Sequence, residues 1–227
     1  MTDIFHEIEE DLRRERFRRL WDRFGLYVIL LAVLVVLGTA AFSGYRWWTV
    51  RQEQAAGAKF EAASQLAGAG KIAEAQTAFT LLSKDATPGY QILARLRLAE
   101  DAARTDARQG VAAFDAIAAD TSLSTSIRDL ARVRAGLLLV DSAPLAEIEQ
   151  RLKGLAESPS ALRFSAREII ALAQYRAGDL AAANKAARLL LEDPDVPAGV
   201  RGHADLLRAL TAAAAQINPA ASPSAPQ

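Results

Sequence analysis

Cysteine is absent from this 227-residue sequence, which excludes disulfide frameworks, thiolate zinc sites and cysteine nucleophiles. Charge of one sign is not in excess either, because 27 basic residues balance 27 acidic ones. A chain without a basic surplus lacks the phosphate-neutralising surface that nucleic-acid binding needs, so nucleic acid is not an expected partner. Aromatic residues are few and gather near the N-terminus, while strong helix formers (Ala, Leu, Arg and Glu) dominate the remainder.

Catalytic and metal-binding motifs are missing as well. The two histidines, His6 and His203, stand in no metal-binding or triad-like pattern, and each is interpreted as a solvated or packing residue. The sequence contains no G-x-x-x-x-G-K-[ST], H-E-x-x-H or G-x-S-x-G motif. Asp193 and Asp195 flank Pro194, where turn formation explains them. We therefore expect no enzyme, no cofactor and no metal site.

One long uncharged stretch is present, the 22 residues 24–45. As a helix it would span about 33 Å, enough to cross the hydrocarbon core of a bilayer. Aromatic residues flank it, and Trp21, Tyr45, Trp47 and Trp48 are predicted to anchor it at the two membrane interfaces. A cleaved signal peptide is the alternative, but the apolar run is longer and begins later than such peptides require. We expect a retained transmembrane helix with the lipid bilayer as its partner.

Basic residues on the two sides of this stretch predict its orientation. Six arginines precede it and three basic residues follow it closely: Arg13, Arg14, Arg16, Arg18, Arg19 and Arg23 against Arg46, Arg51 and Lys59. By the positive-inside rule, residues 1–23 are cytoplasmic and the bulk of the chain lies outside, in the periplasm if the membrane is a bacterial inner membrane. Within this segment, residues 4–21 have apolar side chains at helical spacing. This Arg-rich segment either docks on a partner or lipid, or is a solvated helix that enforces topology.

Beyond the span the sequence predicts only helices. Apolar stretches of helical period alternate with short Gly, Asp or Pro breaks, and no stretch shows the alternation of a strand. We expect helices at 46–67, 71–84, 89–103, 107–119, 124–140, 144–156, 160–177, 179–192 and 197–216. The predicted architecture is all-α, with a single N-terminal transmembrane helix followed by a helical-repeat domain at 46–216. A Pro- and Ala-rich tail, 217–227, is expected to be flexible.

Internal similarity supports a repeat. The segment Gly70-Lys-Ile-Ala-Glu-Ala75 resembles Gly178-Asp-Leu-Ala-Ala-Ala183, and apolar residues follow both at the same offsets. The two glycines are 108 residues apart, which is three times 36, and weaker copies lie around Phe114 and around Leu152. This spacing fits the tetratricopeptide helix–turn–helix of about 34 residues. A plain helical bundle is the alternative, because every helical hairpin favours small residues at its contact.

Taken together, these features resemble the ancillary SecYEG translocon subunit family, the YfgM-like membrane-anchored tetratricopeptide repeat proteins, in its alphaproteobacterial form. The resemblance covers residues 4 to about 216 and rests on the order of the parts. It also rests on three segments: Phe5-His-Glu-Ile-Glu-Glu-Asp-Leu-Arg-Arg-Glu-Arg16, Gly44-Tyr-Arg-Trp-Trp48, and Tyr90-Gln-Ile-Leu-Ala-Arg-Leu-Arg-Leu-Ala99. The long Arg-rich N-terminal segment departs from shorter family members.

This resemblance implies a function in secretion. The expected partners are the SecYEG translocon, a membrane-anchored periplasmic chaperone of the peptidyl-prolyl isomerase type, and exported client chains. The predicted role is to pass those chains to periplasmic chaperones. A scaffold that coordinates cell-envelope assembly or cell division is the alternative.

A repeat solenoid binds partners on its concave surface, which the first helix of each pair lines. With Gly178 as a turn, the preceding helix presents Glu168, Leu172 and Tyr175 inward, and Arg95 is expected at the corresponding place in the second repeat. These four residues are the predicted partner-binding set, with ordinary solvated positions as the alternative reading. The Lys/Asn pattern of repeats that grip chaperone tails is missing.

Overall fold

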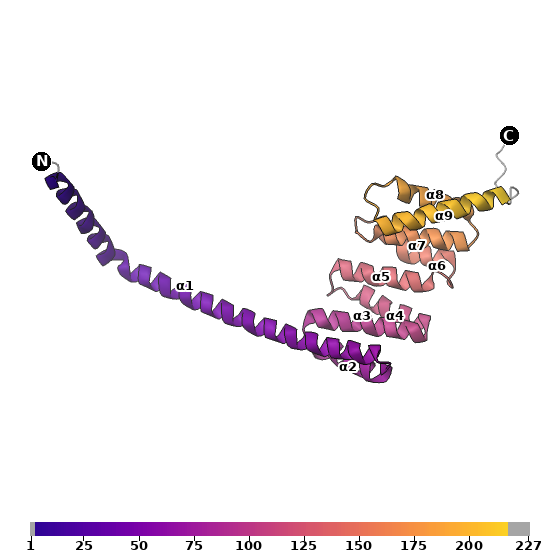
Figure 1. The fold of residues 1–227 in the computed structure, drawn as a ribbon, viewed down its shortest axis with the longest axis horizontal. Coiled ribbons are helices and arrows are strands. Elements are labelled where there is room, and N and C mark those ends of the chain that lie inside the picture. Colours follow the sequence, from indigo (N-terminus) through magenta and orange to yellow (C-terminus); the bar gives the residue numbers. More distant parts are fainter. Residues whose placement is uncertain (1–2, 218–227) are drawn as a thin grey trace. The chain divides into compact units, whose positions relative to one another are not determined.

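The computed structural model describes the backbone of residues 3–217 and, within it, the side chains of residues 18, 21–27 and 29–212 (Figure 1). All the regular elements of this range are helices, which confirms the all-α prediction. The helices are α1 (Asp3–Gly68), α2 (Ile72–Asp85), α3 (Pro88–Thr105), α4 (Ala107–Ala119), α5 (Thr125–Leu139), α6 (Leu145–Ala156), α7 (Arg163–Arg176), α8 (Leu180–Glu192) and α9 (Ala198–Ile217). The chain divides into two compact units, residues 1–58 and 59–227.

From Asp3 to Ala58 the first unit consists of helix α1, which runs unbroken for 66 residues as far as Gly68. The predicted N-terminal segment, span and helix at 46–67 follow one another without a gap, and in the structure one helix runs through all three. The reason is chemical: the first proline of the chain is Pro88, and the glycines of this stretch stand alone among good helix formers. The side chains that carry the amphipathic pattern of residues 1–17 lie outside the described residues, as does the predicted flexible tail beyond Ile217.

Large apolar side chains cover the middle of α1 without any partner in the described structure. Leu30, Leu34 and Leu37 are each more than half exposed, as are most neighbours between residues 24 and 42. This helix is long and apolar enough to cross a membrane, and α1 is the one helix of the described range with that property. The four predicted interface residues are also at least half exposed: Trp21, Tyr45, Trp47 and Trp48.

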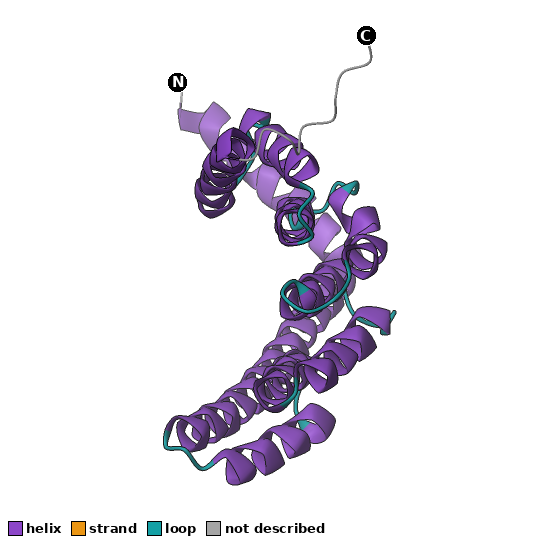
Figure 2. Ribbon diagram, turned by 90° about the vertical axis from the view of Figure 1, so that its right-hand side faces the viewer, coloured by secondary structure: helices purple, strands orange, loops and turns teal. Residues whose placement is uncertain are grey.

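The second unit consists of antiparallel helix pairs joined by short turns. The predicted helix boundaries from residue 71 onward agree with those of α2–α9 to within about three residues. Figure 2 shows that the pairs follow an arc, and Figure 1 views this arc from its inner side, with α3 in front of α4 and α9 in front of α8. The first helix of each pair therefore lies on the inner side of the arc, and the second helix lies outside.

Glycine ends the first helix of the pair α1–α2 and of the pair α7–α8 in the same way. Gly70 and Gly178 have positive φ angles of 78° and 82°, a conformation that other residues rarely adopt. The amide after each glycine donates to a carbonyl five residues back, Lys71 to Leu66 and Asp179 to Gln174. This is the Schellman motif, formed twice in the same register. The repeat predicted from the sequence is thereby confirmed in backbone geometry.

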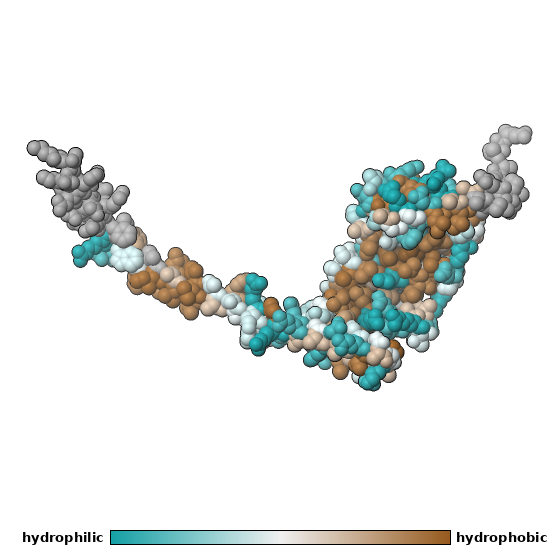
Figure 3. All heavy atoms as spheres, viewed as in Figure 1, coloured by the Kyte–Doolittle hydropathy of each residue, from teal (hydrophilic) through white to brown (hydrophobic). Residues whose placement is uncertain are grey.

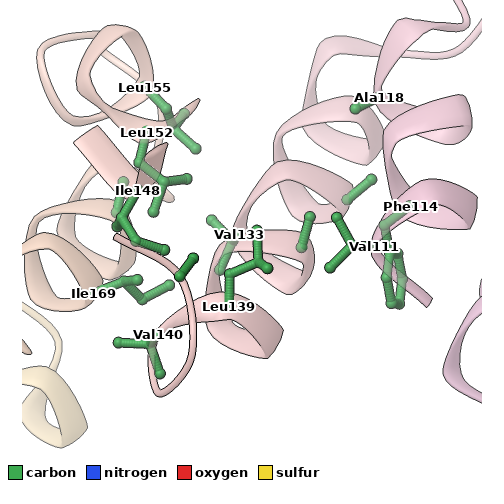
Figure 4. Close-up of a cluster of buried hydrophobic side chains, with 14 of the residues drawn as sticks. Val111, Phe114, Ala118, Val133, Leu139, Val140, Ile148, Leu152, Leu155 and Ile169 are labelled. Carbon is green, nitrogen blue, oxygen red and sulfur yellow. The ribbon is translucent and has the colours of Figure 1, made fainter. Parts of the chain in front are cut away.

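The small and apolar residues that follow each turn form the core. Ala75 and Ala183 are fully buried, and the residues nine positions after each turn glycine, Phe79 and Ala187, are fully buried too. The weaker copies are buried as well, including Phe114 and Leu152 in the largest cluster, between α3 and α7 (Figure 4). Two smaller clusters flank it, one at the end of α1 with α2 and α3, the other in α7–α9. Each pair thus packs against the next, as a solenoid requires.

Candidate partner-binding surface

The inner face of the arc carries an apolar area in its central part. Figure 3, which views this face, shows hydrophobic side chains gathered over the middle of the repeat domain. Leu93 on α3 and Leu137 on α5 are 46% and 49% exposed. An exposed apolar area on a protein surface is typical of a protein-binding site.

A hollow of about 190 Å³ lies between α3 and α5, and we name it the α3–α5 groove. Its lining residues are Glu100, Ala103, Arg104, Phe114, Arg134, Leu137 and Leu138. Phe114 comes from α4, the second helix of the pair, and is nearly buried, so it forms the floor. Because α4 lies on the outer side of the arc, a hollow with its floor on α4 opens on the inner face.

Charged side chains surround the groove without close pairing. Arg134 lies 4.0 Å from Glu100, and Arg97 lies 3.7 Å from the same carboxylate. Arg97 and Arg104 also approach the buried carboxylate of Asp101, at 3.6 and 3.9 Å. None of these ion pairs is a hydrogen bond, because donor and acceptor must come closer than this.

The four residues predicted to bind partners are divided between two parts of the domain. Arg95 lies on α3, and its guanidinium donates to Asp120 at 2.7 Å, at the end of α4. Glu168, Leu172 and Tyr175 lie along α7 at spacings of four and three residues, so they share one side of that helix. The structure brings these three together but places Arg95 several helices away.

Each predicted residue already has a neighbour in the structure. Glu168 lies 2.5 Å from Nδ1 of His203 on α9, and the side chain of that histidine is 68% exposed, in line with the solvated alternative. Leu172 packs partly buried against the central core cluster, and Tyr175 packs against the cluster of α7–α9. Their binding role stays a prediction.

The sequence interpretation overlooked the residues of the α3–α5 groove. A signal for them exists: Leu93, Arg97, Glu100 and Arg104 follow one another at spacings of four, three and four residues, which places them on one side of α3. Arg95 is two positions from Leu93, a rotation of about 200°, and so lies on the opposite side. The spacing of these four residues therefore predicts the groove side of α3, whereas the corresponding place in the repeat predicted Arg95.

Two short ion pairs away from the groove connect different parts of the repeat domain. Arg151 on α6 donates to both carboxylate oxygens of Asp115 on α4, at 2.7 and 2.8 Å, and these hydrogen bonds raise the pKa of Arg151 above its ordinary value. At the end of α4, hydrogen bonds from the Ser122 hydroxyl and from Arg95 lower the pKa of Asp120 to about 2. Within the described residues, no three His, Cys, Asp or Glu side chains are grouped so as to hold a metal ion.

Comparison with known proteins agrees with the repeat architecture. A family model described as "Tetratricopeptide repeat-like domain" matches residues 18–188, which is about three quarters of the chain. No curated protein and no solved structure matches the chain.

Proposed function

Because this chain belongs to the tetratricopeptide repeat-like family, we propose that it is a membrane-tethered scaffold that binds other proteins beside the Sec translocon. Repeat domains of this kind are protein-binding helical scaffolds and are typically non-enzymatic. The observation that carries the proposal is the combination of an inner face with exposed leucines and a helix apolar enough to cross a membrane in one chain.

Tethering provides the mechanism. With α1 in the bilayer, N-terminus in the cytoplasm, the repeat domain stays on the periplasmic side of the inner membrane where exported chains emerge. Confinement of this kind raises the effective concentration of a binding site to about the millimolar range. Contacts of micromolar affinity then suffice to hold an emerging chain and release it to a periplasmic chaperone of the peptidyl-prolyl isomerase type. The order of parts in the sequence, which resembles the ancillary translocon subunits, supports this choice of partners.

Photocrosslinking in cells tests the scaffold and its partners. A photoreactive residue replaces Leu137 on the inner face, and a second variant carries it at Leu34 in the span. Leu189 on α8 is the matched control. It is 56% exposed against 49% for Leu137, and α8 is the second helix of its pair, on the outer side of the arc. We expect crosslinks to translocon subunits from position 34 and to exported chains from position 137, with few from position 189.

Other crosslinking results would contradict the proposal. Capture of wall-synthesis or division proteins in place of secretory ones would favour the envelope-coordinating scaffold. Equal yields from positions 137 and 189 would show that the inner face is not a binding surface. Orientation is tested separately: protease added to spheroplasts should degrade the chain beyond residue 50 and leave residues 1–23 intact.

A further inference from the structure

We propose that the α3–α5 groove binds a polypeptide segment in which an apolar side chain stands next to carboxylates. This inference rests on the proposed scaffold function and specifies the chemistry of the partner.

The apolar part of the partner follows from the lining. Phe114 forms the floor, and the walls include Ala103, Leu137 and Leu138. A hollow of about 190 Å³ takes one side chain rather than a helix or a folded element. Leu93, exposed one turn before Arg97 on the same side of α3, extends the apolar contact along that helix. The shape therefore selects an aliphatic or aromatic side chain within an extended segment.

The carboxylate part follows from arginines that lack acceptors. Arg97, Arg104 and Arg134 make no hydrogen bond within the described part of the chain, and Nε of Arg97 is buried without a partner. Arg95 and Arg151, by contrast, each donate to a carboxylate at 2.7 Å. Arg104 and Arg134 line the groove, and Arg97 lies beside it, three residues before Glu100 on α3. Since each guanidinium offers five N–H donors in a fixed fork, donors here outnumber the acceptors.

Accessible charge at the groove is cationic. Arg104 and Arg134 are 65% and 50% exposed, whereas Glu100 is 38% exposed and Asp101 is only 5% exposed. The carboxylates of Glu100 and Asp101 lie 3.6–4.0 Å from these arginines, which is too long for strong hydrogen bonds. A carboxylate supplied by a partner forms shorter, bidentate, charge-assisted hydrogen bonds with these guanidinium groups. An acidic and apolar segment is complementary to the groove in both respects.

Fluorescence anisotropy with the full-length chain in nanodiscs of neutral lipid tests the proposal. The probes are two labelled peptides of about twelve residues: one alternates Leu with Glu, and the other replaces every Glu with Gln. We expect the acidic peptide to bind roughly tenfold more tightly, since two charge-assisted hydrogen bonds are at stake. In the double variant Arg104→Gln/Arg134→Gln this preference should fall to less than about twofold.

A matched variant and a lipid probe complete the design. Arg188→Gln/Arg208→Gln removes two arginines of α8 and α9 outside the groove and should leave the preference unchanged. The inference is overturned if both peptides bind the unaltered chain equally, or if the control variant loses the preference as well. It is also overturned if vesicles with anionic lipid compete with the acidic peptide while neutral vesicles do not, because a membrane surface would then be the partner.

Failure here is distinguishable from failure of the scaffold itself. Crosslinks from position 137 to exported chains, without enrichment of their acidic and apolar segments, would overturn the carboxylate preference and leave the scaffold function standing. Absence of any crosslink from position 137 would remove the scaffold function and this inference together.

Discussion

At the scale of single residues, Gly110 leaves no room for a side chain. Asp106 is the single residue between α3 and α4, so the two helices meet at a very tight turn. Its carboxylate accepts a hydrogen bond from the amide of Arg108 at 2.8 Å. A Cβ atom on Gly110 would lie 2.3 Å from Cβ and 2.6 Å from Cα of Ala103. Because the obstacle includes backbone, it cannot move aside cheaply.

We therefore predict that Gly110→Ala destabilises the repeat domain by about 3 kcal/mol, the upper end of overpacking costs. Urea unfolding followed by far-UV circular dichroism measures the change. Gly202→Ala on α9 is the control, since an added Cβ there meets nothing within 4 Å, and it should be neutral or stabilising by up to about 1 kcal/mol. Similar unfolding midpoints for both variants would contradict the close approach of α3 and α4.

Asp120 provides a prediction about pH. Hydrogen bonds from the Ser122 hydroxyl, from Arg95 and from the Ser122 amide lower its pKa to about 2. A carboxyl whose pKa is lower when folded stabilises the fold above its unfolded pKa of about 4, and this contribution is lost as the pH falls toward 2. Asp120→Asn should therefore be less stable than the unaltered chain at neutral pH, with a difference that shrinks between about pH 4 and pH 2.

Urea midpoints across that pH range check this prediction. Asp205→Asn is a suitable comparison, because Asp205 on α9 is exposed and lies 3.4 Å from Arg208 of its own helix. Its midpoint should follow that of the unaltered chain. A difference for Asp120→Asn that stayed constant down to pH 2 would show that its carboxyl is not held in the ionised form by Ser122 and Arg95.

At the scale of elements, the turns between paired helices depend on backbone conformation. Gly178 has a φ of 82° and joins α7 to α8. An L-residue in this region costs about 1–2 kcal/mol, so Gly178→Ala should destabilise the repeat domain by that amount. Gly154→Ala, inside α6 with nothing within 4 Å of an added Cβ, is the matched control and should be neutral or slightly stabilising. Thermal unfolding of both variants decides the matter, and equal melting temperatures would contradict the turn's requirement for glycine.

The same turns show how far local sequence determined the elements. Breaks at Gly70, Asp106 and Gly178 predicted where helices end, because each acts within four or five residues of chain. The divisions at residues 23 and 45 follow charge and aromatic flanks, which mark a membrane boundary but do not break hydrogen bonds along a helix, so α1 runs through both. A helix is broken by proline, by a glycine with an alternative bonding pattern or by a competing cap. None of these breaks α1 within residues 3–67.

At the scale of the whole molecule, the apolar middle of α1 should decide where the chain resides. Leu30 and Leu34 are 57% and 67% exposed and have no protein to cover them. Arginine near the centre of a span costs about 2.5–3.5 kcal/mol per residue, so Leu30→Arg/Leu34→Arg should release most of the chain on alkaline carbonate extraction. The unaltered chain should stay in the membrane pellet.

The control places the same two substitutions in the repeat domain. Leu81→Arg/Leu189→Arg alters leucines that are 58% and 56% exposed, and this variant should pellet with the membrane like the unaltered chain. Retention of the Leu30→Arg/Leu34→Arg variant in the pellet would mean that residues 24–45 are not what holds the protein to the membrane.

The sequence by itself determined the helical content, the repeat and the apolar span, because each depends on propensity, period or composition within one segment. It did not determine the partner-binding surface. Arg95 and Asp120 are 25 residues apart, and Glu168 and His203 are 35 apart, so their pairing exists only once helices have packed. The α3–α5 groove likewise joins residues from three helices. Which side of each helix faces the arc is decided by long-range packing, and only the tertiary structure shows it.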